Sequence, residues 1–304
     1  MELIRPNTRF DFIGKKKFTI WVSAIAILLS LGSIFLHGGL RYGVDFAGGI
    51  LIQIKFSKPA DISEVRNALE VTGSNEVLVQ AFGGENEFLI RVEKTTEDLE
   101  AVSKTIQASL QEQFKGKELE IRRVEVVGPK VGKDLKTKAL WAVGLSALGI
   151  LIYVAWRFRE IAFGLGGIVA LFHDVIVVYG TISLGNIEYS LNVMAVVLTI
   201  IGFSINDTIV IFDRVRENIK KMRKESLETI FNVSINETLG RTILTSGTVM
   251  MVVLILFFFG GPVIHDFAFA LIVGLISGTY STIYVASPVV LFWEQHISRR
   301  KKGR

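Results

Sequence analysis

Six long apolar segments dominate this sequence and constrain what the chain can fold into. A helix needs about 20 predominantly apolar residues to cross the hydrocarbon core of a bilayer. Segments of about this length cover residues 18–37, 138–156, 161–183, 189–212, 242–264 and 267–293. With 50% hydrophobic residues, the chain of 304 residues is also too apolar for an ordinary soluble protein. The sequence therefore predicts a polytopic α-helical membrane protein with six transmembrane helices.

The first apolar segment resembles a signal peptide in its position but not in its length. Its uncharged run of 19 residues is longer than a typical signal-peptide core, and no clear small-residue cleavage site follows it. We therefore expect this segment to be a retained membrane helix.

The basic residues indicate how the chain crosses the membrane. Lys and Arg gather in four segments, with five in 1–17, two in 157–160, seven in 213–241 and five in the tail 294–304. Six spans place all four segments on one side, which the positive-inside rule assigns to the cytoplasm. Both chain ends are then cytoplasmic. Because the basic residues are divided among membrane flanks and form no single stripe, nucleic-acid binding is disfavoured.

The region between the first two spans, residues 38–137, has the pattern of a small folded domain outside the cytoplasm. Alternating apolar residues predict strands, and helical spacing predicts helices. The predicted order is strand 49–56, helix 61–73, strand 76–82, strand 87–93 after a hairpin at Gly83-Gly84, helix 96–114 and strand 118–127. This β-α-β-β-α-β order is that of a ferredoxin-like α+β fold. The fold serves many functions, so we expect a docking or recognition module here, with no external active site.

Several classes of chemistry have no support in the sequence. The chain contains no cysteine, which excludes disulfides, thiolate metal sites and a cysteine nucleophile. It has no GxxxxGK[ST] loop, no HExxH motif and no GxSxG motif, so ATP hydrolysis and the corresponding protease and hydrolase classes are disfavoured. We expect neither an enzyme nor a bound cofactor or metal ion.

An aspartate inside the fourth apolar segment is the strongest functional signal. A carboxylate at membrane depth costs several kcal/mol unless it is paired, hydrated or protonated, and Asp207 lies in such a place. Thr199, Gly202 and Asn206 form one stripe of the predicted helix, and Ser204 and Asp207 lie beside it. The pattern indicates a helix with a polar, closely packed side that faces protein or water.

The third segment carries a second buried acidic residue, in the pair His173-Asp174. Gly166, Ala170 and Asp174 are spaced four apart and therefore share one helical stripe, whose small residues permit close packing. Two interpretations remain open: a polar pair that fixes packing, or part of a polar path through the membrane. A metal site is disfavoured because the other three histidines lie near or beyond span ends.

Arg241 lies at the predicted cytoplasmic end of the fifth span and also has two interpretations. It is either an anchor whose side chain reaches the interface or a switchable partner for Asp207. Nearby hydroxyls either line a hydrated passage or bond to their own helix, and they include Thr242, Thr245 and Ser246. In the last span, Gly274 and Gly278 form a GxxxG packing pattern.

A buried carboxylate, hydroxyls and an arginine together suit the uptake and release of a cation across a membrane. One elementary charge moved through the field is worth about 2.3 kcal/mol per 100 mV.

These residues belong to motifs by which the chain resembles the SecF family of protein export subunits. The motifs are GVDFAGG (43–49), VGPKVGKDL (127–135), ALFHDV (170–175), GFSINDTIVIFDRVREN (202–218), RTILTSGT (241–248), FGGPVI (259–264) and GLISGTYSTIYVAS (274–287). They cover nearly the whole chain, and the SINDT…FDRVREN run is highly specific. The chain shows no SecD-like half, so it resembles a separate subunit.

The resemblance implies a function that residue physics alone does not give. SecF is similar to half of a resistance-nodulation-division transporter, pairs with SecD, and associates with the SecYEG channel while SecA acts on the same pathway. The pair is expected to complete translocation of unfolded polypeptides across the bacterial inner membrane, driven by protons or sodium ions. The family's ion-relay residues correspond to Asp207 and Arg241, and SecD supplies a further carboxylate. The alternatives are a half-transporter for lipids or drugs and a structural subunit that conducts no ions.

Overall fold

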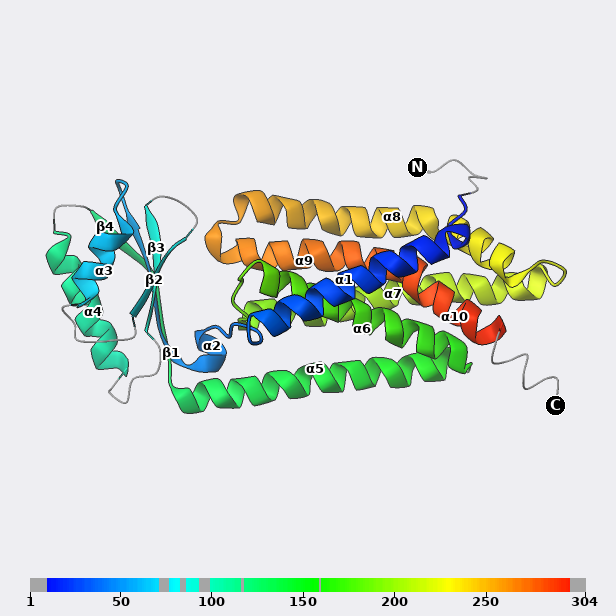
Figure 1. Ribbon diagram of the computed structural model, residues 1–304, viewed down its shortest axis with the longest axis horizontal. Helices are drawn as coiled ribbons and strands as arrows, with labels where there is room; N and C mark the ends of the chain where they lie inside the picture. The colour runs from blue at the N-terminus through cyan, green and yellow to red at the C-terminus, as the bar shows by residue number, and fades with distance from the viewer. Residues whose placement is uncertain are drawn as a thin grey trace. The chain divides into compact units, whose positions relative to one another are not determined.

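The computed structural model describes residues 10–70, 77–82, 86–92, 99–115, 118–158 and 160–295. These residues form two compact units. The helical unit comprises residues 10–41, 143–187 and 192–295, and the sheet unit comprises residues 42–142 and 188–191, within the described ranges. The two units are described separately below, and Figure 1 labels their helices and strands.

Among the described residues, six helical segments are long and apolar enough to cross a membrane, which agrees with the predicted number. They are α1 (Lys16–Leu36, preceded by the 3₁₀ turn Ile13–Lys15), α5 (Pro129–Phe158), α6 (Ile161–Leu184), α7 (Leu191–Lys221), α8 (Leu227–Phe259) and α9 (Pro262–Ser281). The last helix, α9, continues through the π-helical turn η2 (Thr282–Ala286) into α10 (Ser287–Trp293).

The helix ends differ from the predicted spans, for local reasons. Helix α7 continues past residue 212 to Lys221. Hydropathy detects only the apolar part, whereas the charged residues that follow are good helix formers. Helix α8 begins at Leu227 and ends at Phe259, short of the predicted residue 264. Gly261 has φ +74°, and Pro262 is the first residue of α9, so the chain turns there and starts a new helix.

The helical unit has a buried centre and exposed flanks. About half of the apolar stretches of α6, α7 and the α9–α10 segment is buried, against 11% in α5 and α8. Helix α6 packs against α1, α9, η2 and α10, and Figure 1 shows α1 lying across α6. The exposed apolar residues of α1, α5 and α8 suit contact with lipid or another membrane protein.

Glycines permit the closest approaches between these helices. A Cβ at Gly274 would lie 1.8 Å from Ile200 Cδ1 of α7, and a Cβ at Gly166 would lie 2.9 Å from the carbonyl oxygen of Ala286. At Gly278 it would lie 3.2 Å from Ser204 Cβ. Gly202 has no such neighbour in this chain: a Cβ there meets nothing within 4 Å, because this side of α7 is exposed, so its packing role stays a prediction.

The sheet unit has the predicted β-α-β-β-α-β order. Its elements are β1 (Gly49–Phe56), α3 (Ile62–Glu70), β2 (Val77–Ala81), β3 (Glu87–Val92), α4 (Leu99–Gln113) and β4 (Leu119–Val127), with a short helix α2 (Val44–Ala47) before β1 that was not predicted. The sheet order is β2-β3-β1-β4, and neighbouring strands are antiparallel. The predicted hairpin at Gly83-Gly84 and the predicted ends of the two helices at 71–73 and 96–98 lie outside the described residues.

One face of the sheet is covered by helices, as alternation predicts. Figure 1 shows α3 and α4 on the same side of the strands. Alternate residues of β1, including Ile50, Ile52 and Ile54, are fully buried with Val65 of α3. The predicted apolar face of α4 packs into this core through Leu99, Val102, Ile106, Leu110 and the following Phe114.

Substitution of Gly274 tests the α7–α9 packing. Gly274→Ala places a methyl group against Ile200, which is 1% exposed and has little room to move. We expect a loss of about 1–3 kcal/mol, the usual range for overpacking, seen as a lower melting temperature in detergent. The control is Gly247→Ala on α8, where nothing lies within 4 Å and no loss is expected. Equal melting temperatures for the two variants would contradict this packing.

Candidate functional site

Asp174 of α6 lies at the centre of the helical unit and is bound by three serines. The residue is 1% exposed. Its Oδ2 accepts hydrogen bonds from Ser204 Oγ of α7 (2.6 Å) and Ser281 Oγ of α9 (2.7 Å). Its Oδ1 accepts one from Ser277 Oγ of α9 (2.6 Å) and lies 3.1 Å from His173 Nδ1. The cluster therefore joins three helices.

The hydrogen bonds around Asp174 occupy the whole carboxylate. An ionised carboxylate offers about four lone-pair positions and donates nothing, so His173 Nδ1 must be the donor. The cluster therefore gives each oxygen of Asp174 two hydrogen-bond partners.

The imidazole of His173 connects the cluster to α1. Its ring stacks on Tyr280 of α9, with 6.0 Å between centroids and 29° between planes. The Tyr280 hydroxyl donates to the Thr19 carbonyl oxygen of α1 (2.6 Å) and accepts from Ser23 Oγ (3.1 Å). His173 Nε2 is buried, and no hydrogen-bond partner for it is found among the described residues.

Asp207 of α7 has a different environment from Asp174. Its residue exposure is 6%, and its Oδ1 accepts one hydrogen bond, from Thr242 Oγ1 of α8 (2.6 Å). Its Oδ2 is buried, and the described part of the chain supplies no hydrogen bond to it. A buried acceptor without a partner costs about 1–3 kcal/mol, and more when it is charged. Asp207 therefore has an oxygen available for a proton or an incoming donor, whereas Asp174 has none.

The structure does not place Arg241 against Asp207. Arg241 is exposed, and the two side chains form no ion pair, although its neighbour Thr242 is buried against Asp207. Exposure at the end of the apolar part of α8 is what the anchor interpretation predicts. Pairing with Asp207 would require the Arg241 side chain or α8 to move.

The predicted polar path is only partly assembled. The structure brings together Ser204, His173 and Asp174, and separately Thr242 and Asp207. Thr199 and Thr245 are exposed and donate to carbonyl oxygens of their own helices, and Asn206 is exposed. Ser246 instead pairs with Thr279 of α9 (3.1 Å). Among the described residues, these hydroxyls therefore fall into separate groups.

Four further polar residues were not predicted as members of the site. Ser277 and Ser281 bind Asp174, and Thr282 lies 2.9 Å from Thr208 between hydroxyl oxygens. The sequence offered one signal for the two serines: Ser277 and Ser281 are four residues apart, which places both on one face of α9. Thr282 also begins the π-helical turn, a feature common at functional sites.

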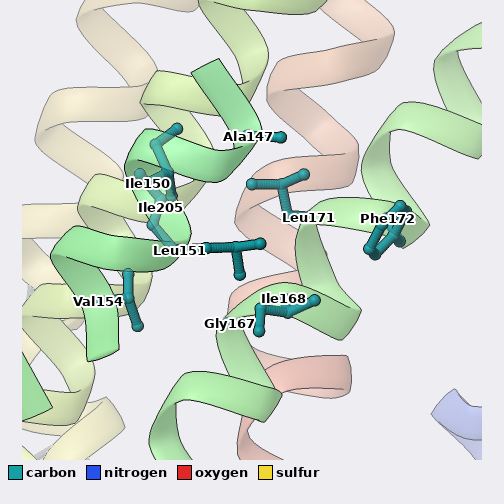
Figure 2. A pocket seen from close by; sticks show the side chains of 9 residues that line it. All are labelled: Ala147, Ile150, Leu151, Val154, Gly167, Ile168, Leu171, Phe172 and Ile205. Atoms are coloured by element: carbon teal, nitrogen blue, oxygen red, sulfur yellow. The ribbon is translucent and has the colours of Figure 1, made fainter. Parts of the chain in front are cut away.

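A small cavity between α5, α6 and α7 is unsuited to an ion. Figure 2 shows its nine lining side chains, including Ile150, Leu171 and Ile205, and none is polar. Its volume is about 30 Å³. Among the described residues, no group of three His, Asp or Glu residues could hold a metal ion.

Comparison with known proteins gives consistent matches along the chain. The model for the protein export membrane protein SecD/SecF C-terminal region matches residues 105–296, and the SecD/SecF GG motif matches residues 33–60. The protein translocase subunit SecF of Calditerrivibrio nitroreducens is 47% identical, over 95% of this chain and 96% of its own length. The protein translocase subunit SecF of Thermodesulfovibrio yellowstonii is 45% identical, over 95% of this chain and 96% of its own length.

Solved structures of SecDF are similar in fold. SecDF from Thermus thermophilus, described as a translocon-associated membrane protein, is 35% identical with a TM-score of 0.85 over 96% of this chain. A super-membrane-facing form of SecDF has a TM-score of 0.72 and the same identity. The chain spans 40% of the length of the first and 41% of the second.

The two buried aspartates should respond differently to the same substitution. Asp174→Asn turns one acceptor oxygen into a donor, so the two donors on that oxygen, such as Ser204 and Ser281 on Oδ2, lose their acceptor, at about 1–3 kcal/mol each. Asp207→Asn keeps the oxygen that accepts from Thr242. We expect a melting temperature several degrees lower for Asp174→Asn than for Asp207→Asn in detergent. The reverse order would show that the Asp174 cluster does not hold the helices together.

Proposed function

The chain belongs to the SecF family of protein translocase subunits, and from this premise we propose that it uses an ion gradient to drive late steps of protein export. In this proposal it pairs with SecD in the bacterial inner membrane, beside the SecYEG channel on which SecA acts. The pair completes the transfer of unfolded polypeptides. The observation that carries the proposal is the buried Oδ2 of Asp207, for which the described residues supply no hydrogen bond.

Asp207 is the residue that we propose takes up and releases the ion. With one hydrogen bond to Thr242, its carboxyl group can accept a proton without displacing another donor. The ionised form has to find a further donor or cation, because an unpaired charge at this depth is unfavourable. A change of charge on Asp207 therefore directly affects the packing between α7 and α8.

We propose that Arg241 is the cation that pairs with the ionised Asp207 carboxylate. It precedes Thr242 on α8 and is exposed, and its side chain makes no ion pair with Asp207 in this structure. Movement of Arg241 toward an ionised Asp207 would displace α8, or its side chain, relative to α7. Asp174 differs from Asp207 in that each of its oxygens already has two hydrogen-bond partners.

SecD is the partner that we propose covers the exposed side of α7. Thr199, Gly202 and Asn206 lie on that side and are exposed in the chain alone. Small and polar residues of this kind are typical of contacts between membrane helices. A SecD carboxylate on this side would complete the relay with Asp207.

We propose that both chain ends lie in the cytoplasm and that the sheet unit lies outside it. The support is the concentration of Lys and Arg at the chain ends and in two of the loops between spans. In this arrangement the chain catalyses no reaction of its own, and the ion gradient supplies the free energy.

Asp207→Asn tests the ion-relay role. The amide imitates the protonated carboxyl group and cannot release a proton, so we expect at least a tenfold loss of gradient-driven export. The measurement is export into membrane vesicles that contain the chain and SecD, with and without an imposed proton or sodium gradient. The level of the complex is measured in parallel.

Asp266→Asn is the control for this experiment, because Asp266 is an aspartate of α9 whose side chain is 42% exposed. It should export normally. Normal export by Asp207→Asn would refute the relay. Loss of the complex itself would favour the structural-subunit alternative, and a lipid or drug phenotype with unchanged export would favour the half-transporter.

A further inference from the structure

Helix α7, which carries Asp207, begins inside the sheet unit. Residues 188–191 belong to this unit and lie against residues 42–48, the segment before β1. Tyr42 and Tyr189 form a parallel β-bridge, and the Gly43 N–H donates to the Tyr189 carbonyl oxygen (3.0 Å). The Tyr189 ring stacks on Phe46, with 5.5 Å between centroids. We call residues 42–48 together with 188–191 the junction.

Asp45 of the junction bonds to the first turn of α7. Its Oδ2 accepts a hydrogen bond from the backbone N–H of Leu191, the first residue of the helix (2.9 Å). The first N–H groups of a helix have no partner within the helix, and a carboxylate there is stabilised by the helix dipole. Asp45 supplies this partner from a distant part of the chain, so the start of α7 is bound to the segment that leads into β1.

Arg91 attaches both halves of the junction to the middle of the sheet. It lies on β3 and is 3% exposed. Its Nη1 donates to Glu188 Oε1 (2.9 Å), and its Nη2 donates to the Tyr42 carbonyl oxygen (2.7 Å). One rigid guanidinium therefore holds the segment before α7 and the segment before β1 at the same time.

Glycines allow a third segment to join the same place. Gly48 has φ +77°, and a Cβ there would lie 2.9 Å from Pro129 Cα, at the start of α5. A Cβ at Gly132, one turn into α5, would lie 3.0 Å from the Gly48 nitrogen. Neither position accepts a side chain without movement of backbone. This close contact explains why position 48, the first of the two glycines at the end of the GVDFAGG motif, carries no side chain.

We propose that the junction is the mechanical link through which a change of charge at Asp207 is transmitted to the sheet unit, with Asp45 as its positioning residue. Helix α7 is continuous from Leu191 to Lys221 and contains no proline. A change of tilt at Asp207 therefore reaches Leu191 along about 24 Å of regular helix, with Ser204, which is bound to Asp174, as the pivot. With Leu191 bound by Asp45, the displacement moves the junction. Without that bond, the first turn of α7 can fray and absorb it.

The transmission rests on the proposed ion-relay role of Asp207, but it has its own readout. Hydrogen exchange of residues 42–48 and 188–194 is measured in the full complex with SecD, with Asp207 and with Asp207→Asn. When Asp45 is intact, Asp207→Asn should change exchange in residues 42–48 by at least threefold. In Asp45→Ala that response should disappear, although the complex remains.

Three variants separate a broken link from a damaged fold. Asp61→Ala removes a comparable carboxylate in the same unit, one that accepts from the Ser63 N–H at the start of α3 (2.9 Å), and should keep the full response. Asp45→Asn retains an acceptor oxygen and should also keep it. Leu191→Pro removes the donated N–H from the other side, at a helix position where proline is favoured, and should abolish it.

The outcomes distinguish this inference from the proposed function. A response that persists in both Asp45→Ala and Leu191→Pro overturns the link, as does the absence of any response with Asp45 intact. An Asp45-dependent response combined with normal export by Asp207→Asn supports the link and refutes the ion-relay role. An Asp45-dependent response combined with a loss of gradient-driven export supports both.

Discussion

The four hydrogen bonds of Asp174 are the interaction on which the helical unit depends. Helices in a bilayer gain little from apolar contact with one another, so polar bonds and close packing determine which helices meet. Asp174 binds α7 through Ser204 and α9 through Ser277 and Ser281. The glycine at position 278 permits the approach, since a Cβ there would lie 3.2 Å from Ser204 Cβ. Charge and close packing therefore specify the same arrangement.

The two buried aspartates show how surroundings give one side chain two roles. Asp174 has two hydrogen-bond partners on each oxygen and acts as part of the framework, whereas Asp207 keeps an oxygen without a donor from the described residues. Both aspartates act on α7. Asp207 belongs to this helix, and Ser204, three residues before it, donates a hydrogen bond to Asp174. One point of the helix is thus held while a neighbouring point can change its charge. This pairing of a fixed site with a switchable one suits a helix that must move without losing its place in the bundle.

The features that follow from local physics were predictable from the sequence, and those that depend on distant partners were not. Hydropathy identified six helices and alternation identified the strands, but helical propensity beyond the apolar part decided where α7 ends. Asp207 was found because a charge in an apolar run is conspicuous. Ser277 and Ser281 were missed because hydroxyls in membrane helices usually bond to their own backbone. Periodicity places Gly202 on a side of its helix but does not say what that side faces.

The π-helical turn in the last span solves a problem of angular register. Ser277 and Ser281 face Asp174 on α6, and beyond the turn Ala286 and Val290 lie close to Gly166 on the same helix. Along the chain, Ser277, Ser281, Ala286 and Val290 follow one another at steps of four, five and four residues. In an uninterrupted α-helix, a step of five would rotate Ala286 and Val290 by about 140° away from the serines. The wider turn takes up the additional residue, so that a single face of the span both binds Asp174 and packs against Gly166.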